Sequence, residues 1–528
     1  MSKLLLLFSL LPLFLAAQPK ITRSDAARTA LNGAVKGFAR EPNTNNLLVL
    51  NNRVQPGVAL SYNARFHWGI DVFTPDLKLV STGQEEKINF PDGSRTSSTI
   101  MASMGGIPKL LFWQYEKKEK KLRIFGASIE PGGKIGSLKP LGSLAGDLRK
   151  LEDEPTCVYS LDSSYLLMMI PIEFSKKSTQ ISCLVLDRNW KVVREEVLAL
   201  PVLNAKYFFG KAIINKDASI WLPVLVREEN KDISQEIWVW ENGKPELTRI
   251  DISLSTNFLI TSVVLNQSED MVYAGGLYCI KDKEAQKAIY NPVYPIIVDE
   301  QYDGHPAQGT FLIKIDRKAH SILSKNSSRF SEPILKYWER TVEKLERGGG
   351  LNNLVARKIC LNSDGGAWLC IENYYYLPHI NQESPKDRPD GGKDYFGSAL
   401  FVQYDAENKV VQEFKVGKGL YSYNLEVSGY FFAIQGKNTL MIYNDHKANL
   451  DQTNKTNDGA FAVGMSSKPH AVIRYTGYKD GEIKPHEIFN DKEKAGLIRP
   501  HAYIEWSPGV FVFPYYRDKD YGLLKVEM

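Results

Sequence analysis

The stretch CLVLDRNWKVVREEVL (residues 183–198) and its counterpart LFVQYDAENKVVQEFKV (residues 400–416) carry the fold prediction. Each contains an apolar strand, a polar turn and a second strand that opens with a lysine. Asp, Asn, Gly and Pro favour tight turns, and a lysine suits an exposed edge strand because it discourages pairing with another edge. The two stretches therefore predict β-hairpins whose second strand lies at the edge of a sheet.

The same unit begins again near residues 70, 123, 237, 311 and 472, and an eighth apolar strand, GLLKVEM, ends the chain at residues 522–528. A second element precedes three of the hairpins. In it, Asn215, Asn266 or Asn362 opens a polar turn that leads into an apolar strand. Together the two elements give four strands per unit, at the spacing that a ring of four-stranded blades requires.

The frame Asn-x-Asp-x-x-x-Trp at residues 215–221 is similar to the repeats of the secreted β-propeller superfamily. This resemblance implies an all-β propeller of four-stranded blades, with eight blades favoured and seven as the alternative. A pair of packed β-sandwiches is the competing architecture. The last hairpin lacks a fourth strand, and we expect a strand near residues 46–51 (NLLVLN) to supply it and close the ring.

The first 18 residues, MSKLLLLFSLLPLFLAAQ, have a charged start, a short apolar run and small residues at the end. This pattern is typical of a secretory signal peptide, so we expect an exported protein, periplasmic or extracellular, whose residues 19–528 form one propeller domain. We expect no membrane span after signal removal. Two apolar stripes at helical spacing predict short helices at residues 24–38 and 331–347, the second one capped by Ser331.

The formal net charge of +5 is small for 528 residues, so nothing in the balance indicates a nucleic-acid partner. The five cysteines do not form a disulfide framework. Cys360 and Cys370 flank one turn and are either bonded or two small buried groups in strands. The histidines show no paired ligand spacing, so we expect no metal and no cofactor.

The long loops all connect second strands to third strands or one blade to the next, which places them on one face of a propeller. They span residues 281–308, 377–397 and 446–468 within blades, and 330–353 and 490–500 between blades. Binding residues usually lie on loops that a rigid scaffold carries. We therefore expect the ligand on this loop-elaborated face.

Two clusters approach that face, ENYYYLPH at residues 372–379 and RPHAYIEW at residues 499–506. Tyrosines beside arginine, histidine and glutamate suit stacking on sugar rings or binding of an acidic group. The candidate ligand-binding residues are Arg357, Glu372, Tyr375, His379, Arg499, His501, Glu505, Tyr515 and Tyr516.

These features favour a non-catalytic propeller that binds a protein or a glycan. One alternative is a carbohydrate-active hydrolase or lyase, for which Glu372, Glu505 and His501 are the available acid and base groups, although no residue is assigned a catalytic role. A further alternative is an assembly or scaffold component of the cell envelope. The propeller fold hosts all three classes of protein, so the fold alone does not choose between them.

Overall fold

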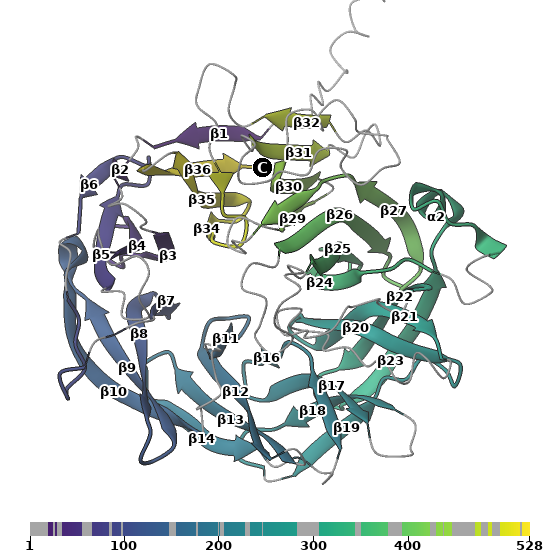
Figure 1. The fold of residues 1–528 in the computed structure, drawn as a ribbon, viewed down its shortest axis with the longest axis horizontal. Coiled ribbons are helices and arrows are strands. Elements are labelled where there is room, and N and C mark those ends of the chain that lie inside the picture. The colour runs from purple at the N-terminus through teal and green to yellow at the C-terminus, as the bar shows by residue number, and fades with distance from the viewer. Residues whose placement is uncertain are drawn as a thin grey trace, which may run out of the picture.

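The computed structural model describes residues 19–528 except 25–26, 29–33, 55–65, 84–86, 95, 97–98, 147–154, 176–177, 199, 201–204, 228–232, 245, 282–305, 344–349, 378–392, 423–428, 437, 446–469, 477–483, 488–496 and 518–519. The described strands form eight antiparallel sheets of four to six strands. The sheets stand side by side around a central opening, as in a β-propeller (Figure 1). We number them as blades 1 to 8 in chain order. The expectation of an all-β propeller of four-stranded blades is confirmed.

The first four blades run from the inner strand at the central opening to the outer edge. Blade 1 contains β3 (Ala34–Arg40), β4 (Leu47–Val54), β5 (Phe66–Phe73) and β6 (Leu79–Ser81). Blade 2 contains β7 (Thr99–Met104), β8 (Ile107–Glu116), β9 (Lys121–Ile129), the 3-10 turn η1 (Pro131–Gly133) and β10 (Ile135–Ala145). Blade 3 contains β11 (Thr156–Tyr159), β12 (Tyr165–Ser175), β13 (Ser178–Asp187) and β14 (Val192–Leu198). Blade 4 contains β15 (Lys206–Phe209), β16 (Ile213–Ile214), β17 (Ile220–Arg227), β18 (Ser234–Trp240) and β19 (Leu247–Asp251).

The other four blades complete the ring. Blade 5 contains β20 (Phe258–Gln267), β21 (Met271–Ile280), β22 (Gly309–Asp316) and β23 (Ser321–Arg329), and the helix α2 (Glu332–Tyr337) follows it. Blade 6 contains β24 (Leu354–Leu361), β25 (Ala367–Leu377), β26 (Lys393–Tyr404), β27 (Val410–Val416) and β28 (Leu420–Ser422). Blade 7 contains β29 (Tyr430–Gln435), β30 (Asn438–Asp445), β31 (His470–Thr476) and β32 (Lys484–Glu487). Blade 8 contains β33 (Leu497–Ile498), β34 (Ile504–Ser507), β35 (Val510–Arg517) and β36 (Asp520–Glu527), together with β1 (Lys20–Arg23) and β2 (Ala27–Arg28).

The hairpin unit of the sequence corresponds to the third and fourth strands of the blades. All eight third strands were predicted at the right place, from β5 in blade 1 to β36 in blade 8. The lysines that follow the turns are exposed beside the outer strand, as their role as edge residues requires: Lys78, Lys134, Lys191, Lys244, Lys318 and Lys409. The apolar residues fill the spaces between neighbouring sheets, so the core is a set of clusters at the seams between blades.

The prediction for ring closure was wrong in the strand that it used. Residues 46–51 belong mostly to β4, the second strand of blade 1. The outer strand of blade 8 is instead β1, which pairs with β36 in the register Lys20 to Glu527. The amino-terminal segment thus holds the carboxyl-terminal strand, and Figure 1 shows β1 beside β36.

The helix predicted at residues 24–38 was also wrong, because the described part of this segment forms β2 and β3. Over a few residues, small and branched apolar side chains fit the helical period of about 3.6 residues as well as the strand period of about 2. Pairing with a sheet then decides which structure forms. The second predicted helix is shorter than expected. Its regular part is α2, where Ile334 and Leu335 are buried against the ring, and Ser331 makes no side-chain cap hydrogen bond.

In blades 3, 5 and 6, the turn between the third and fourth strands contacts the preceding blade. Trp190 has a left-handed backbone, with φ of 65°, and packs its ring into the seam with blade 2. His320, with φ of 52°, stacks edge-on against Trp221 of blade 4. Asn408, with φ of 64°, donates a hydrogen bond to the hydroxyl of Ser324 in blade 5. In each of these three turns, one residue with a left-handed backbone docks onto the neighbouring blade.

Blade 2 makes the same contact with a glycine, and this gives a testable prediction. Gly133 has φ of 84°, and a Cβ atom there would lie 2.7 Å from the carbonyl oxygen of Ile70 in blade 1. Gly132 beside it has φ of 79° and open space around it. We expect Gly132→Ala to cost about 1 kcal/mol for backbone strain, and Gly133→Ala to cost about 1–3 kcal/mol more because of the clash. Urea denaturation of both variants measures the difference, and equal losses would mean that this turn does not dock on blade 1.

No helix among the described residues is long and apolar enough to cross a membrane. Residues 1–18 lie outside the described part of the chain, so the signal peptide stays a prediction.

Candidate functional site

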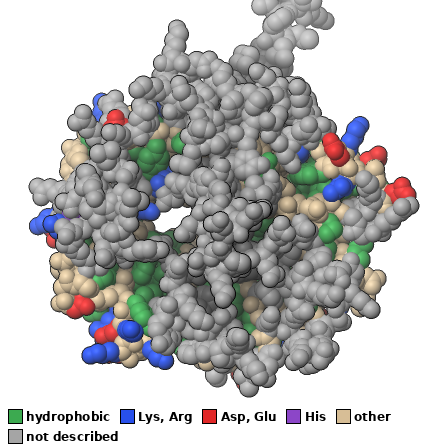
Figure 2. Space-filling model, in the orientation of Figure 1, with side chains coloured by type: hydrophobic (Ala, Val, Ile, Leu, Met, Phe, Trp, Pro, Cys, Tyr) green, Lys and Arg blue, Asp and Glu red, His purple; other side chains and the backbone are tan. Residues whose placement is uncertain are grey.

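A pocket of about 670 Å³ opens into the centre of the ring, between blades 8, 1, 2 and 3. Its walls come from β3, the end of β7, the end of β11 and the segment that joins β33 to β34. Figure 2 shows the opening near the centre of the ring, with Lys or Arg side chains at its left edge. The lining residues are Val35, Lys36, Gly37, Phe38, Met101, Ser103, Tyr159, Ser163, Arg499, His501, Ala502, Tyr503, Ile504 and Glu505.

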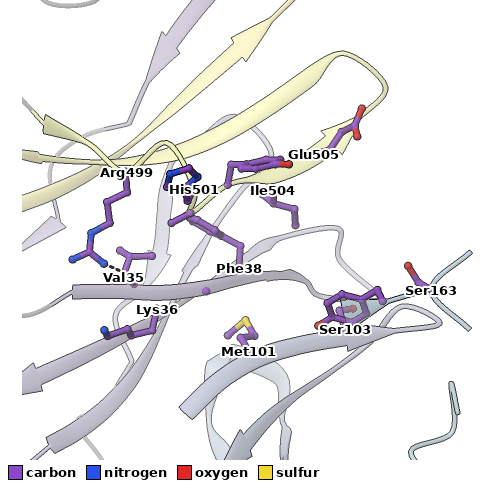
Figure 3. A pocket seen from close by; sticks show the side chains of 14 residues that line it. Val35, Lys36, Phe38, Met101, Ser103, Ser163, Arg499, His501, Ile504 and Glu505 are labelled. Carbon is purple, nitrogen blue, oxygen red and sulfur yellow. Dashed lines mark hydrogen bonds between the residues drawn. The ribbon is translucent and has the colours of Figure 1, made fainter. Parts of the chain in front are cut away.

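The inner strand of blade 8 is interrupted, and this interruption forms one wall of the pocket. Ile498 pairs with Tyr515 and Ile504 pairs with Val512, so five residues of the inner strand face only two of its partner. Excess residues of this kind bend a strand and re-aim its side chains. Arg499 and His501 were predicted near the axis, and both line the pocket (Figure 3).

Arg499 is held rigidly at the seam between blades 8 and 1. Its Nη1 donates to the carbonyl oxygen of Val35 at 2.8 Å, the contact drawn in Figure 3. Its guanidinium lies 4.7 Å from the ring centre of Tyr516. The Tyr516 hydroxyl in turn accepts a hydrogen bond from the backbone N–H of Val35 at 2.8 Å. Arg499 and Tyr516 therefore fix the start of β3 as well as one wall of the pocket.

His501 borders the opening and is exposed to it, while protein atoms of the neighbouring blades crowd around the imidazole. Its Nε2 packs on Gly429, where a Cβ atom would lie only 2.3 Å away. Desolvation lowers the pKa of His501 to about 4, and the positive charges of Arg357, Lys358 and Lys418 act in the same direction against the opposing carboxylate of Glu372. The imidazole is therefore neutral at pH 7 and offers one donor and one acceptor to a ligand.

The titration of His501 is directly measurable. We expect its NMR-detected midpoint near 4, well below the usual 6.5, with the resonance assigned by its loss in His501→Gln. Because the unfolded chain binds this proton first, acidification from pH 6.5 towards 4 favours unfolding, and this part of the acid sensitivity should vanish in His501→Gln. A midpoint near 6.5 would show that the imidazole is fully hydrated.

Glu372 was predicted as a ligand or acid group, and it is instead buried and fully engaged. Only 1% of the residue is exposed. One carboxylate oxygen accepts from Lys418 Nζ at 2.6 Å and the other accepts from Arg357 Nε at 2.8 Å. Arg357 reaches it because it is the extra residue of a bulge in β24, between Ala356 and Lys358. The two cations outweigh desolvation and lower the pKa of Glu372, so the carboxylate stays ionised.

The other predicted site residues are distributed unevenly. Tyr515 is buried, and its hydroxyl donates to the carbonyl oxygen of Ser24 at 3.3 Å, which ties the amino-terminal segment to blade 8. Glu505 lines the pocket, but in Figure 3 its carboxylate points away from His501. The backbone of Tyr375 lies in β25, while its side chain and His379 lie outside the described part of the structure.

Several residues of the opening were missed in the sequence. Tyr159 and Tyr503 line the pocket and are 38% and 41% exposed. Lys36 is the extra residue of a bulge in β3, between Val35 and Gly37, and Lys211 lies in the gap between β15 and β16. The signal that could have found the lysines is the adjacent glycine, in Lys36-Gly37 and Gly210-Lys211, since glycine within a strand often marks a bulge.

The five cysteines are free thiols. Cys360 is opposite Trp368 and Cys370 is opposite Lys358, so the two cysteines are diagonal neighbours on adjacent strands. The Cys370 thiol donates a hydrogen bond to Cys360, and the nearby Lys358 ammonium adds a positive charge. Together these two effects outweigh burial, which would raise the pKa, and they lower the pKa of Cys360 to about 6. Among the described residues, no group of three or more His, Cys, Asp or Glu side chains gathers as a metal site.

No protein-family model and no curated protein matches the chain. The solved structures that resemble it include the Dos1 propeller, with 8% identity, a TM-score of 0.43 and coverage of 96% of this chain and 94% of that one. An ulvan lyase described as a new family of polysaccharide lyase has 10% identity, a TM-score of 0.40 and coverage of 80% and 90%. The propeller domain of the Trilobed protease from Pyrococcus furiosus has 10% identity, a TM-score of 0.34 and coverage of 90% and 98%. These proteins differ in activity, and the likenesses are too distant to choose among them.

Proposed function

We propose that this chain is an exported binding protein that holds a glycan in the central pocket without turning it over. The observation that carries the proposal is the pair of exposed tyrosines, Tyr159 and Tyr503, which line one pocket together with Arg499 and His501. Tyrosine rings stack on the apolar faces of sugars, and fixed polar groups at the edge of such a site give it orientation. A volume of about 670 Å³ lies within the range that ligand pockets occupy.

The arrangement of the acidic groups favours binding over catalysis. General acid–base chemistry needs a carboxyl group or an imidazole within hydrogen-bond reach of the substrate. Glu372 has both oxygens committed to Lys418 and Arg357. Glu505 lines the pocket, but its carboxylate points away from His501. The named acid and base groups therefore do not converge on one bond of a substrate.

The test is a thermal-shift screen of the purified protein against neutral and acidic oligosaccharides. A ligand at about 100 times its Kd stabilises the folded state by roughly 2.7 kcal/mol, which is a visible shift. Tyr503→Ala should weaken binding about 3- to 10-fold because it removes one stacking face. Tyr337→Ala is the matched control, since Tyr337 lies on α2, away from the pocket lining. Stabilisation by a protein and by no glycan, or equal binding by both variants, would contradict the proposal.

A further inference from the structure

The two inner strands of blade 6 carry two thiols and one ammonium group on the same face. In the register of β24 and β25, Lys358 lies directly opposite Cys370, and Cys360 lies two residues further along β24. Side chains two residues apart on a strand point to the same face of the sheet, as do those directly opposite each other on paired strands. The three groups are therefore neighbours on the innermost strand pair of blade 6 (Figure 1).

This face lies in the seam with blade 7. Cys370 is 0% exposed in an aromatic cluster that includes Tyr430 and Phe432 of blade 7, and Cys360 packs against the same cluster. The Nζ of Lys358 donates a hydrogen bond to the carbonyl oxygen of Phe432, which holds the ammonium on this side of the sheet. Cys360 is only half-buried, whereas Cys370 is fully covered. One thiol of the pair is therefore partly exposed and the other lies behind it.

The contacts within this group give the two cysteines different protonation states. Cys360 accepts a hydrogen bond from the Cys370 thiol and lies beside the Lys358 ammonium, and its pKa is lowered to about 6. Burial and the same hydrogen bond raise the pKa of Cys370 well above its usual value. Burial opposes the charge on Lys358, but the negative charge of Cys360 raises the pKa of this lysine. At neutral pH the pair is thus a thiolate in contact with a thiol, and the thiolate is the nucleophile.

We propose that Cys360 is a site of oxidation by hydrogen peroxide and that Cys370 closes the product to a reversible disulfide within blade 6. In the first step the Cys360 sulfur attacks the peroxide, so that an S–O bond forms and the O–O bond breaks. The sulfur is oxidised to a sulfenic acid, the peroxide is reduced, and the hydroxide that leaves takes up the proton that Cys360 had released to solvent. This inference does not depend on the glycan function.

In the second step the Cys370 sulfur attacks the oxidised sulfur of Cys360. An S–S bond forms, the S–O bond breaks, and the hydroxyl group leaves as water with the proton of the Cys370 thiol. Two thiols and one hydrogen peroxide thus give one disulfide and two waters. Diagonal neighbours in a sheet are roughly 7–8 Å apart, beyond the usual span of a disulfide, so closure has to draw β24 and β25 together locally. We therefore expect a strained bond that mild reductants reopen.

Peptide mapping of the oxidised protein tests the pair. Reduced protein is treated with hydrogen peroxide, its remaining thiols are blocked, and its peptides are identified by mass spectrometry. We expect one linked peptide that joins Cys360 to Cys370 and disappears with dithiothreitol. In Cys370→Ser we expect a sulfenic acid at Cys360 that dimedone traps, and no linked peptide. Unreacted Cys360, or its oxidation in wild-type protein without a bond to Cys370, would overturn the proposal.

The rate of alkylation by iodoacetamide tests the reactivity of Cys360 without any oxidant. Cys157 is the matched control, because it is also half-buried but its thiol donates to the carbonyl oxygen of Pro155 at 3.6 Å. At pH 6 about half of Cys360 is thiolate, against about 0.3% of a thiol with the ordinary pKa of about 8.5. The lower nucleophilicity of a low-pKa thiolate offsets about tenfold of this advantage, so Cys360 should react about tenfold faster than Cys157.

The dependence of this rate on pH identifies the role of the lysine. We expect half-maximal alkylation of Cys360 near pH 6 in wild-type protein and at a higher pH in Lys358→Met, which keeps the apolar stem and removes the charge. The Lys318→Met variant is the control, since Lys318 is an exposed turn lysine after the third strand of blade 5. Equal rates for Cys360 and Cys157 at pH 6, or a Cys360 rate that rises only above pH 8, would contradict the proposal.

Discussion

Glu372→Gln will destabilise the ring by about 3–5 kcal/mol in chemical denaturation. The substitution removes the negative charge that faces Lys418, whose Nζ lies 2.6 Å from the carboxylate while only 1% of that side chain is exposed. A buried ammonium without an anionic partner is among the most costly single changes in a protein interior. Replacing Lys418 with methionine in the same chain should recover much of the loss, because the buried charge is then absent.

A surface ion pair of similar length provides the control for this prediction. Lys216 Nζ lies 2.8 Å from Glu269, and the two side chains are 44% and 78% exposed. Exposed pairs contribute little, so Glu269→Gln should change stability far less than Glu372→Gln. The folded state lowers the pKa of Glu372, so its stabilisation is present above the unfolded value of 4.5 and is lost as the pH falls through the folded value. Equal losses in the two variants would show that water reaches Lys418.

Asp71→Ala will open the seam between blades 1 and 8, at a cost of about 3–5 kcal/mol. Asp71 is 1% exposed and accepts hydrogen bonds from the Asn51 amide at 2.7 Å, from the Gly83 N–H at 3.0 Å and from the hydroxyl of Tyr521. Alanine removes this acceptor from the Gly83 N–H and the Tyr521 hydroxyl, while the Asn51 amide keeps the Tyr521 hydroxyl as a partner at 3.0 Å. The measurement is urea denaturation, which reports the free energy of unfolding.

Two further variants define what the Asp71 result means. Tyr521→Phe removes one donor from the same network and should cost less than Asp71→Ala, about 1–2 kcal/mol. Asp187→Ala removes the acceptor of two backbone N–H groups at an exposed turn, where water can replace it, and should have the smallest effect. If Asp187→Ala and Asp71→Ala cost the same, the blade seam does not depend on this buried network.

The repeating part of the fold could be read from the sequence because it rests on local chemistry. The carboxylate of a turn aspartate accepts hydrogen bonds from backbone N–H groups a few residues later, as Asp187 does from Asn189 and Lys191. This turn can be recognised in the sequence because it depends on no distant contact. Ring closure could not be read in this way. Whether Lys20–Arg23 or another strand pairs with β36 depends on which free edge it meets, and that is decided by long-range packing.

The site was predictable only in part, for the same reason. The interruption at residues 499–503 was visible as a cluster of polar residues, so Arg499 and His501 were found. Tyr515 and Glu372 are residue types that often bind ligands, but here both are buried. The Tyr515 hydroxyl hydrogen-bonds the carbonyl oxygen of Ser24, and the Glu372 carboxylate pairs with Lys418. Burial is a tertiary property. Replacing Arg499 and Tyr515 together with alanine would therefore damage the closing seam as well as any ligand contact.

We propose that the ligand binds in the pocket at the centre of the ring. The most direct measurement compares the Kd of the best oligosaccharide for wild-type protein with its Kd for Ser103→Trp, a substitution on the pocket wall that fills part of its volume. We predict that binding by Ser103→Trp is lost or weakened at least tenfold while its thermal midpoint without ligand stays close to that of wild type. An unchanged Kd in a folded Ser103→Trp protein would place the ligand elsewhere on the ring and contradict binding in the central pocket.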